Sequence, residues 1–371
     1  MSERVIESRE SLARLRSAAR SLDRTVRFME VCGTHTVNAF RSGLHSLMPV
    51  NVVLLSGPGC PVCVTPQGEI DQLIELSRRP GVTLCTYGDM VRVGGHGGSL
   101  EDARAGGADV RVVYSVLDAV KLAARQPQRQ VVFAAVGFET TAPATAVAIL
   151  EAARLGLRNL TVFPSHKRIV PAMRALLASR VKVDGFICPG HVAVIIGAEA
   201  FRPVVIEYGL SCVITGFEGP QIAAALARLC ELALAGRAAL ENLYPQAVLP
   251  TGNRRAQELI DQVFEPADAC WRGLDRLPAS GLSLRADFER FDACRRYALT
   301  AADHRDPPGC RCGDVITGRC TPPQCRLFAR GCTPVQPVGP CMVSSEGTCQ
   351  AWFKYRRGAR RPRGVEIGSG S

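Results

Sequence analysis

Residues 51–79 have the sequence NVVLLSGPGCPVCVTPQGEIDQLIELSRR, and this stretch decides the fold. NVVLL (51–55) is a short apolar run typical of a strand buried on both faces, and GEIDQLIELSRR (68–79) places apolar residues at helical spacing. The loop between them is rich in glycine and proline and holds Cys60 and Cys63. A strand followed by a helix predicts a parallel sheet covered by helices.

Strands of the same kind alternate with helical stretches as far as residue 215. The other predicted strands are VRFMEV (26–31), VTLCT (82–86), VRVVYS (110–115), VVFAAV (131–136), LTVF (160–163), DGFICP (184–189) and CVIT (212–215). They could form one large sheet or two smaller ones, and we favour two. The predicted fold class is therefore α/β, with two parallel-sheet α/β units and an irregular, cysteine-rich C-terminal iron–sulfur domain.

The 371 residues are long enough for two or three domains. We expect an N-terminal helix (1–25), an α/β domain with Cys32 and the Cys60/Cys63 pair (26–130), a second α/β domain (131–245), a cluster domain (246–356) and a disordered basic tail (357–371). Past Pro245 the character of the chain changes. The cysteine-rich block from Pro307 to Pro340 is dense in proline and glycine and poor in periodicity, so we expect it to need a cross-link, namely a metal, to fold.

Composition excludes several classes of protein. No apolar run approaches the roughly 18 residues of a membrane span. The first twenty residues lack the apolar core of a secretory signal, so we place the protein in the cytoplasm. The net charge of +11 comes mostly from arginine, and no groove-reading motif accompanies it, so we do not expect nucleic-acid binding.

Sixteen cysteines in a reducing compartment indicate metal or redox chemistry rather than stable disulfides. Cys60 and Cys63 follow a strand and precede a helix, a setting that lowers a thiol pKa, and the pair can form a disulfide or chelate a metal. Cys32 also ends a predicted strand and can meet this pair at the same sheet edge. Three thiolates form a soft donor set suited to low-valent iron, copper(I) or zinc.

His35 lies three residues after Cys32, one helical turn away if a helix begins at Gly33. It could be a fourth ligand, a proton donor, a hydrogen-bond donor to an exogenous ligand, or a structural residue. We favour a role beside the metal, in which His35 donates a hydrogen bond or a proton.

A second group of cysteines lies near the C-terminus. The spacing Cys312-x7-Cys320-x4-Cys325-x6-Cys332, with Cys349 beyond it, offers five candidates for the four thiolates of a [4Fe-4S] cluster. A zinc site is the alternative. Cys310 and Cys341 lie outside this spacing, and five other cysteines in apolar stretches are predicted to be core residues; these are Cys85, Cys212, Cys230, Cys270 and Cys294.

Polar residues recur where the predicted strands end, which is where open parallel sheets bind ligands. The candidates for this crevice are Asp89, Glu139, Thr140, His191 and Glu218. In GFETTAP, Thr140 or Thr141 can cap a helix while Glu139 projects into the crevice, although a plain helix cap is an equal alternative.

Five motifs give the chain a family resemblance. MEVCGTHT (29–36), GPGCPVCV (57–64), GFETT (137–141), PGHV (189–192) and SSEGTC (344–349), in this order, resemble the [NiFe]-hydrogenase maturation protein family HypD from about residue 26 to 356. In that family the protein is a scaffold that assembles an Fe(CN)2(CO) unit together with a small HypC-type chaperone. The unit is then delivered to the hydrogenase large subunit, and cyanide comes from a HypE-type partner that carries a thiocyanate.

The resemblance also implies roles for the cysteines. Cys32, Cys60 and Cys63 match the positions that handle iron(II), and the C-terminal cysteines match the [4Fe-4S] site. Releasing cyanide from a thiocyanate needs two electrons, which a dithiol beside an iron–sulfur cluster could supply. We therefore expect a metal-centre assembly scaffold with redox activity, and leave open whether it is an enzyme in its own right. The alternatives are an iron–sulfur thiol–disulfide reductase and a zinc-stabilised binding module.

Overall fold

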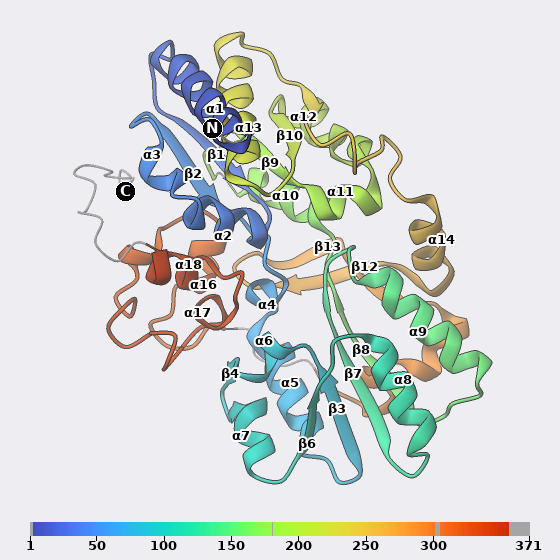
Figure 1. Cartoon of the computed structure of the whole chain (residues 1–371). Coiled ribbons are helices and arrows are strands. Elements are labelled where there is room, and N and C mark those ends of the chain that lie inside the picture. Colours follow the sequence, from blue (N-terminus) through green and yellow to red (C-terminus); the bar gives the residue numbers. More distant parts are fainter. Residues whose placement is uncertain (1–2, 180, 301–304, 356–371) are drawn as a thin grey trace.

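The computed structural model describes residues 3–179, 181–300 and 305–355 (Figure 1). The predicted basic tail (357–371) lies outside these residues. Within them, no helix has the length and apolar character needed to cross a membrane.

Two parallel sheets form the centre of the molecule (Figure 1). The first has the order β11-β10-β9-β1-β2. Its strands are β1 (Val26–Glu30), β2 (Val52–Ser56), β9 (Gly185–Pro189), β10 (Ser211–Thr215) and β11 (Leu240–Asn242). The second has the order β6-β3-β7-β8, with β3 (Val82–Thr86), β6 (Asp109–Val112), β7 (Gln130–Gly137) and β8 (Leu160–His166). The predicted α/β class with two parallel sheets is confirmed.

All eight predicted strands are present, with small shifts at their ends. β6 ends at Val112 because Ser115 accepts a hydrogen bond from the Leu117 amide and begins a helix. β8 continues to His166, which pairs with Gly137 of β7. β11 was not predicted, because three half-buried residues at a sheet edge leave no pattern in the sequence.

The sheets interleave along the chain, so they do not follow the expected division into 26–130 and 131–245. β1 pairs with β9, with Met29 opposite Phe186, and β7 pairs with β3, with Val132 opposite Leu84. The sequence did not show this because a helical crossover can return a parallel strand to either side of a sheet. The start of the expected cluster domain (246–356) also differs, since Ile260 and Phe264 pack in the core of the second sheet.

The helices cover these sheets and connect their strands. They are α1 (Glu3–Arg20), α2 (Gly33–Arg41), α3 (Leu44–Leu47), α4 (Pro61–Val64), α5 (Gln67–Ser77), α6 (Gly88–Val91), α7 (Leu100–Ala105), α8 (Val116–Arg125), α9 (Ala142–Arg154), α10 (Ile169–Ala178), α11 (Gly190–Ile196), α12 (Arg202–Tyr208), α13 (Gly219–Leu234), α14 (Arg254–Val263) and α15 (Ala293–Arg296), with 3-10 turns η1 (Ala198–Phe201) and η2 (Ala286–Phe291).

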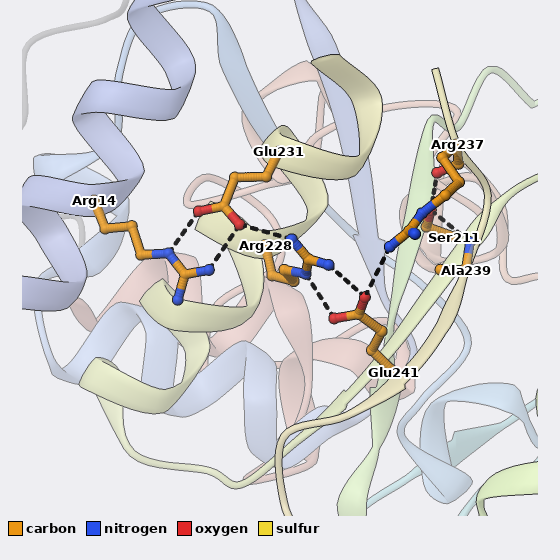
Figure 2. A network of polar contacts seen from close by, with 7 residues as sticks. All are labelled: Arg14, Ser211, Arg228, Glu231, Arg237, Ala239 and Glu241. Carbon is orange, nitrogen blue, oxygen red and sulfur yellow. Dashed lines mark hydrogen bonds and ion pairs between the residues drawn. The ribbon is translucent and has the colours of Figure 1, made fainter. Parts of the chain in front are cut away.

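The N-terminal helix α1 packs on α13, as Figure 1 shows. Leu15 of α1 and Leu226 of α13 are fully buried in the core of the first sheet. Figure 2 shows a polar network at this junction: Arg14 pairs with Glu231 at 2.5 Å, and Arg228 links Glu231 to Glu241 of β11. These groups are partly exposed, so each pair stabilises the fold by about 1 kcal/mol at most.

Antiparallel strands complete the fold. The long hairpin of β12 (Phe264–Trp271) and β13 (Asp275–Leu284) packs on β8 and α10, and a short one joins β4 (Gly94–Gly95) to β5 (Gly98–Ser99).

The C-terminal region contains α16 (Cys312–Ile316), η3 (Pro322–Gln324), α17 (Pro340–Val343) and α18 (Thr348–Tyr355), joined by irregular segments. α16 and α17 pack on α4, and α18 packs on α2 (Figure 1). One hydrophobic core includes Cys63, Trp271 and Cys312, so this region is continuous with the rest of the molecule. Its irregular, cysteine-rich character agrees with the prediction.

Candidate functional site

The loops after β1 and β2 lie against each other at the carboxyl edge of the first sheet. The Gly57 amide donates to the Glu30 carbonyl at 2.7 Å, and the Gly33 amide donates to the Gly59 carbonyl at 3.1 Å. A Cβ on Gly59 would lie 2.1 Å from the Cys32 nitrogen, so only glycine fits there. This contact places the Cys32 loop directly beside the loop that carries Cys60.

Cys60 and Cys63 form a disulfide at the ends of the first turn of α4, with their Cα atoms 5.2 Å apart. Cys60 is 5% exposed and Cys63 is fully buried. The Cys63 amide donates to the Cys60 sulfur at 3.2 Å, as expected for a sulfur at the start of a helix. The structure therefore holds this pair in its oxidised form.

Cys32 precedes α2 and is 7% exposed. Burial raises the pKa of its thiol to about 12; the backbone amide of His35 acts against this, whereas the carboxyl group of Glu346 adds to it. The thiol is therefore protonated at neutral pH. A cation that binds there must displace this proton.

Glu30, which the sequence analysis did not single out, lies beneath Cys32. Its carboxyl group accepts hydrogen bonds from the Cys32 amide at 3.0 Å and from the Thr36 hydroxyl. Burial raises the pKa of Glu30 to about 8. A glutamate at the end of an otherwise apolar strand was the signal that could have identified it.

His35 is fully buried, and its Nε2 atom lies 2.9 Å from the Gly216 carbonyl oxygen in the loop after β10. That nitrogen must carry the proton, which leaves Nδ1 as an acceptor with no partner among the described residues. Burial lowers the pKa of His35 to about 4. The ring is neutral, so this geometry does not support the expected role as a proton donor at neutral pH.

The segment Ser344–Glu346 of the C-terminal region covers these loops. The Ser344 hydroxyl lies 3.3 Å from the Cys60 sulfur and donates to the Asp89 carboxylate at 3.0 Å. The Thr34 hydroxyl donates to Glu346 at 2.7 Å. Asp89, a crevice candidate from the sequence, thus lies beside these loops, while Ser344 and Glu346 were noted only as part of a motif.

The other crevice candidates fall into two groups. His191 is exposed and stacks on Phe217 with ring centroids 3.8 Å apart, and Glu218 is exposed at the start of α13. Both follow strands of the first sheet, the sheet that carries Cys32.

Glu139 and Thr140 follow β7 of the second sheet. Glu139 is buried and accepts from the Ile169 amide at 3.0 Å, so it caps α10. It lines a cavity of about 490 Å³ with Arg168 and Arg174, and no cysteine lines that cavity. Thr140 is exposed, and α9 begins after Thr141. Neither residue belongs to the cysteine site.

The C-terminal cysteines gather around a small apolar cavity. Four of the five expected ligands line it, namely Cys312, Cys325, Cys332 and Cys349, and so do Cys310 and Cys341. Cys320 is buried but is not among the lining residues. The Cys341 thiol interacts with both Cys312 and Cys349, and the Cys349 amide donates to the Cys341 sulfur at 3.2 Å. Spacing alone missed Cys310 and Cys341, because the fold brings them in from either side of the expected run.

The donor chemistry of this cavity fits an iron–sulfur cluster, since several thiols converge in an apolar setting away from water. Within residues 3–179, 181–300 and 305–355, no three His, Cys, Asp or Glu side chains are arranged to bind a single metal ion. The three thiols expected to hold iron are therefore not assembled as a ligand set while Cys60 and Cys63 are bonded to each other.

Comparisons with known proteins agree on one family. A profile of the HypD family, described as "Hydrogenase formation hypA family", matches residues 7–356. The chain is 48% identical over 342 residues to hydrogenase maturation factor HypD of Azotobacter vinelandii, with 90% of each chain covered. It is 46% identical over 352 residues to hydrogenase expression/formation protein HupD of Azotobacter chroococcum mcd 1, covering 93% of this chain and 92% of that protein. It is 43% identical over 337 residues to hydrogenase maturation factor HypD of Escherichia coli (strain K12), with 90% of each covered.

Proposed function

Since the chain belongs to the HypD family of hydrogenase maturation factors, we propose that it is a scaffold on which the Fe(CN)2(CO) unit of a [NiFe]-hydrogenase is assembled. The observation that carries this proposal is the contact between the Cys32 and Cys60 loops at one sheet edge. The free thiol of Cys32 and the Cys60–Cys63 disulfide therefore lie on loops that contact each other. We propose that the protein works in the cytoplasm, where this disulfide can be reduced.

Iron(II) is the cargo, and the proposed ligands are the thiolates of Cys32, Cys60 and Cys63 once the disulfide is reduced. Thiolates suit low-valent iron and leave positions for diatomic ligands. Because the pKa of Cys32 is raised, iron binding must release its proton. A thiolate from a HypC-type chaperone can complete the coordination before transfer to the hydrogenase large subunit.

Cyanide release requires a balanced redox step. A HypE-type partner offers a thiocyanate, R–S–C≡N, and the Cys60/Cys63 dithiol reduces it to cyanide. The dithiol loses two protons and two electrons and becomes the disulfide, and the thiocyanate takes up two electrons and one proton to give R–SH and CN⁻. One proton is released to solvent. On this proposal the disulfide between Cys60 and Cys63 is the product of that step.

The electrons that restore the Cys60/Cys63 dithiol pass through the cavity lined by the C-terminal cysteines. We propose that four of the six cysteines that line the cavity hold a [4Fe-4S] cluster, and that Cys320, which does not line it, is not a ligand. This ligand set differs from the one expected from spacing. When bound, the cluster supplies electrons one at a time. Cys312 and Cys341 line this cavity and belong to the same buried core as Cys63.

The disulfide beside a thiol cavity also favours the alternative, an iron–sulfur thiol–disulfide reductase. An assay of hydrogenase maturation in cells distinguishes the assembly scaffold from the reductase. A strain that lacks its own HypD-type protein is given this chain, and hydrogenase activity is measured. We expect the wild type to restore activity and Cys32→Ala to fail, with Cys85→Ala, a buried core thiol on the second sheet, as the matched control. A reductase needs only the disulfide pair, so full activity of Cys32→Ala would support the alternative.

A further inference from the structure

Arg272 is a buried cation at the junction between the disulfide helix and the thiol cavity. It follows β12, and its side chain has no exposure to solvent. Its guanidinium donates twice to the Thr65 carbonyl, at 3.2 and 3.0 Å, and once to Gln67 at 3.3 Å. Its backbone amide donates to the Val64 carbonyl at 2.8 Å. All three acceptors lie within four residues after Cys63.

The opposite end of the guanidinium faces the C-terminal region. Its Nη1 atom pairs with the Asp306 carboxylate, whose second oxygen accepts from the Gly313 amide at 3.1 Å. Gly273 has a φ of +75°, and a Cβ there would lie 2.6 Å from the Gly313 carbonyl oxygen. Arg272 and Asp306 therefore connect the end of α4 to the start of α16, immediately after Cys312.

Burying a cation costs several kcal/mol unless it is paired and hydrogen-bonded. Packing alone would be satisfied by an apolar side chain at this position. The arrangement instead places the guanidinium between the segment that follows Cys63 and the Asp306 carboxylate.

We propose that Arg272 is a positioning residue that holds the Cys60–Cys63 disulfide in register with the thiol cavity for electron transfer. The inference rests on the proposed function, in which the cavity supplies the electrons that regenerate the dithiol. An external one-electron donor delivers two electrons in succession through the cavity. The S–S bond breaks, the two sulfurs take up two protons from water, and two thiols form. Arg272 itself neither gains nor loses a proton or an electron. It fixes the distance between the cavity and the Cys60–Cys63 disulfide, and it places a positive charge between them.

The test follows reduction of the disulfide in the full chain with its cluster bound, under anaerobic conditions. Photoreduced 5-deazaflavin is the one-electron donor, and new thiols at Cys60 and Cys63 are trapped by alkylation and located by mass spectrometry. A parallel series uses dithiothreitol, which attacks the disulfide directly. The variants are Arg272→Met, Arg272→Lys, and the control Arg276→Met, whose exposed side chain pairs with Asp268 within the β12–β13 hairpin.

We expect Arg272→Met to slow the deazaflavin route by about tenfold, because loss of the contacts to Thr65 and Asp306 lets the disulfide move out of its position relative to the cavity. Arg272→Lys should restore part of the rate, and Arg276→Met should behave as wild type. Rates with dithiothreitol should change less than about threefold, which a purely structural loss of the fold would not allow. A wild-type rate for folded, cluster-containing Arg272→Met would overturn the inference.

Two further measurements keep the outcomes distinct. Should Arg272→Met fail to fold because Asp306 is left unpaired, the double variant Arg272→Met with Asp306→Asn removes both charges together, and the same slow deazaflavin route is expected. The proposed function fails separately if wild-type disulfide is reduced by deazaflavin no faster than in a cluster-free Cys332→Ser variant. In that case the cavity does not deliver electrons to the disulfide, and the role proposed for Arg272 is also wrong.

Discussion

Gly59 lies so close to Cys32 that a Cβ on the glycine would fall 2.1 Å from the Cys32 nitrogen and 2.3 Å from its Cα. The two residues end loops from neighbouring parallel strands, β1 and β2, which pair in register from Val26 opposite Val52. Because Gly59 has no side chain, the loop that carries Cys60 can pack directly on the Cys32 backbone. This contact sets the position of the free Cys32 thiol relative to the Cys60–Cys63 disulfide.

Replacing Gly59 with alanine should separate the two loops. Because the added methyl group meets backbone that cannot rotate away, we expect a loss of about 1–3 kcal/mol in the free energy of unfolding, measured by denaturant titration. Gly94→Ala is the control, since no atom lies within 4 Å of a Cβ at that position. Equal stabilities of the two variants would contradict the close contact.

The cluster ligands can be separated by two conservative variants. Cys332→Ser removes a thiol that lines the cavity, whereas Cys320→Ser removes one that does not. We expect the first to lose most of its bound iron and its brown absorbance and the second to keep both. The measurement is iron content and visible absorbance after anaerobic reconstitution. Loss of the cluster in Cys320→Ser alone would return Cys320 to the ligand set.

Glu139 should make the stability of the fold depend on pH. Burial raises its pKa from 4.5 to about 7, so the folded chain keeps a proton that the unfolded chain has already lost. The free energy of unfolding should therefore fall as pH rises from about 4.5 to about 7, by at most about 1.4 kcal/mol per pH unit.

Glu139→Gln keeps an acceptor for the Ile169 amide and should remove this slope. Glu151→Gln is the control, because the Arg154 guanidinium holds the pKa of that exposed carboxyl below its usual value. Denaturant titrations at several pH values give the comparison. An unchanged slope in Glu139→Gln would show that its carboxyl ionises as it would in water.

Variants of His35 test how α2, the helix that follows Cys32, is held against the loop after β10. His35→Gln retains an N–H group that can donate to the Gly216 carbonyl, whereas His35→Leu leaves that carbonyl unpaired at a cost of about 1–3 kcal/mol. We expect His35→Gln to keep its bound iron and to slow maturation only modestly, measured by metal analysis and hydrogenase activity. Iron loss as complete as that of Cys32→Ala would instead make His35 a direct ligand.

The sequence predicted the eight main strands because each is an apolar run bounded by turn residues, as at residues 51–55. It did not predict which strands pair, since nothing in β1 indicates that its second neighbour is β9, more than 150 residues later. The same dependence on long-range pairing determined which residues of the site could be predicted. Cys32 and Cys60 follow adjacent strands and were expected together, whereas Ser344 and Arg272 reach the site only through long-range packing.

The cavity cysteines show a second limit of sequence analysis. Regular spacing favoured Cys320, yet the fold turns that residue away and brings in Cys310 and Cys341. Spacing describes a ligand set only when the ligands lie on one continuous segment. Here the thiols come from α16, α17, α18 and the loops between them, so their arrangement depends on how those elements pack on α4.

Infrared spectroscopy tests the central proposal most directly. The protein is produced together with its HypC-type chaperone and HypE-type partner, purified without oxygen and compared with its Cys32→Ala variant. The account predicts stretching bands of iron-bound CN and CO in the wild type, which move to lower frequency with ¹³C-labelled ligands and vanish in Cys32→Ala. Protein that supports maturation and holds its cluster but shows no such bands would contradict the scaffold.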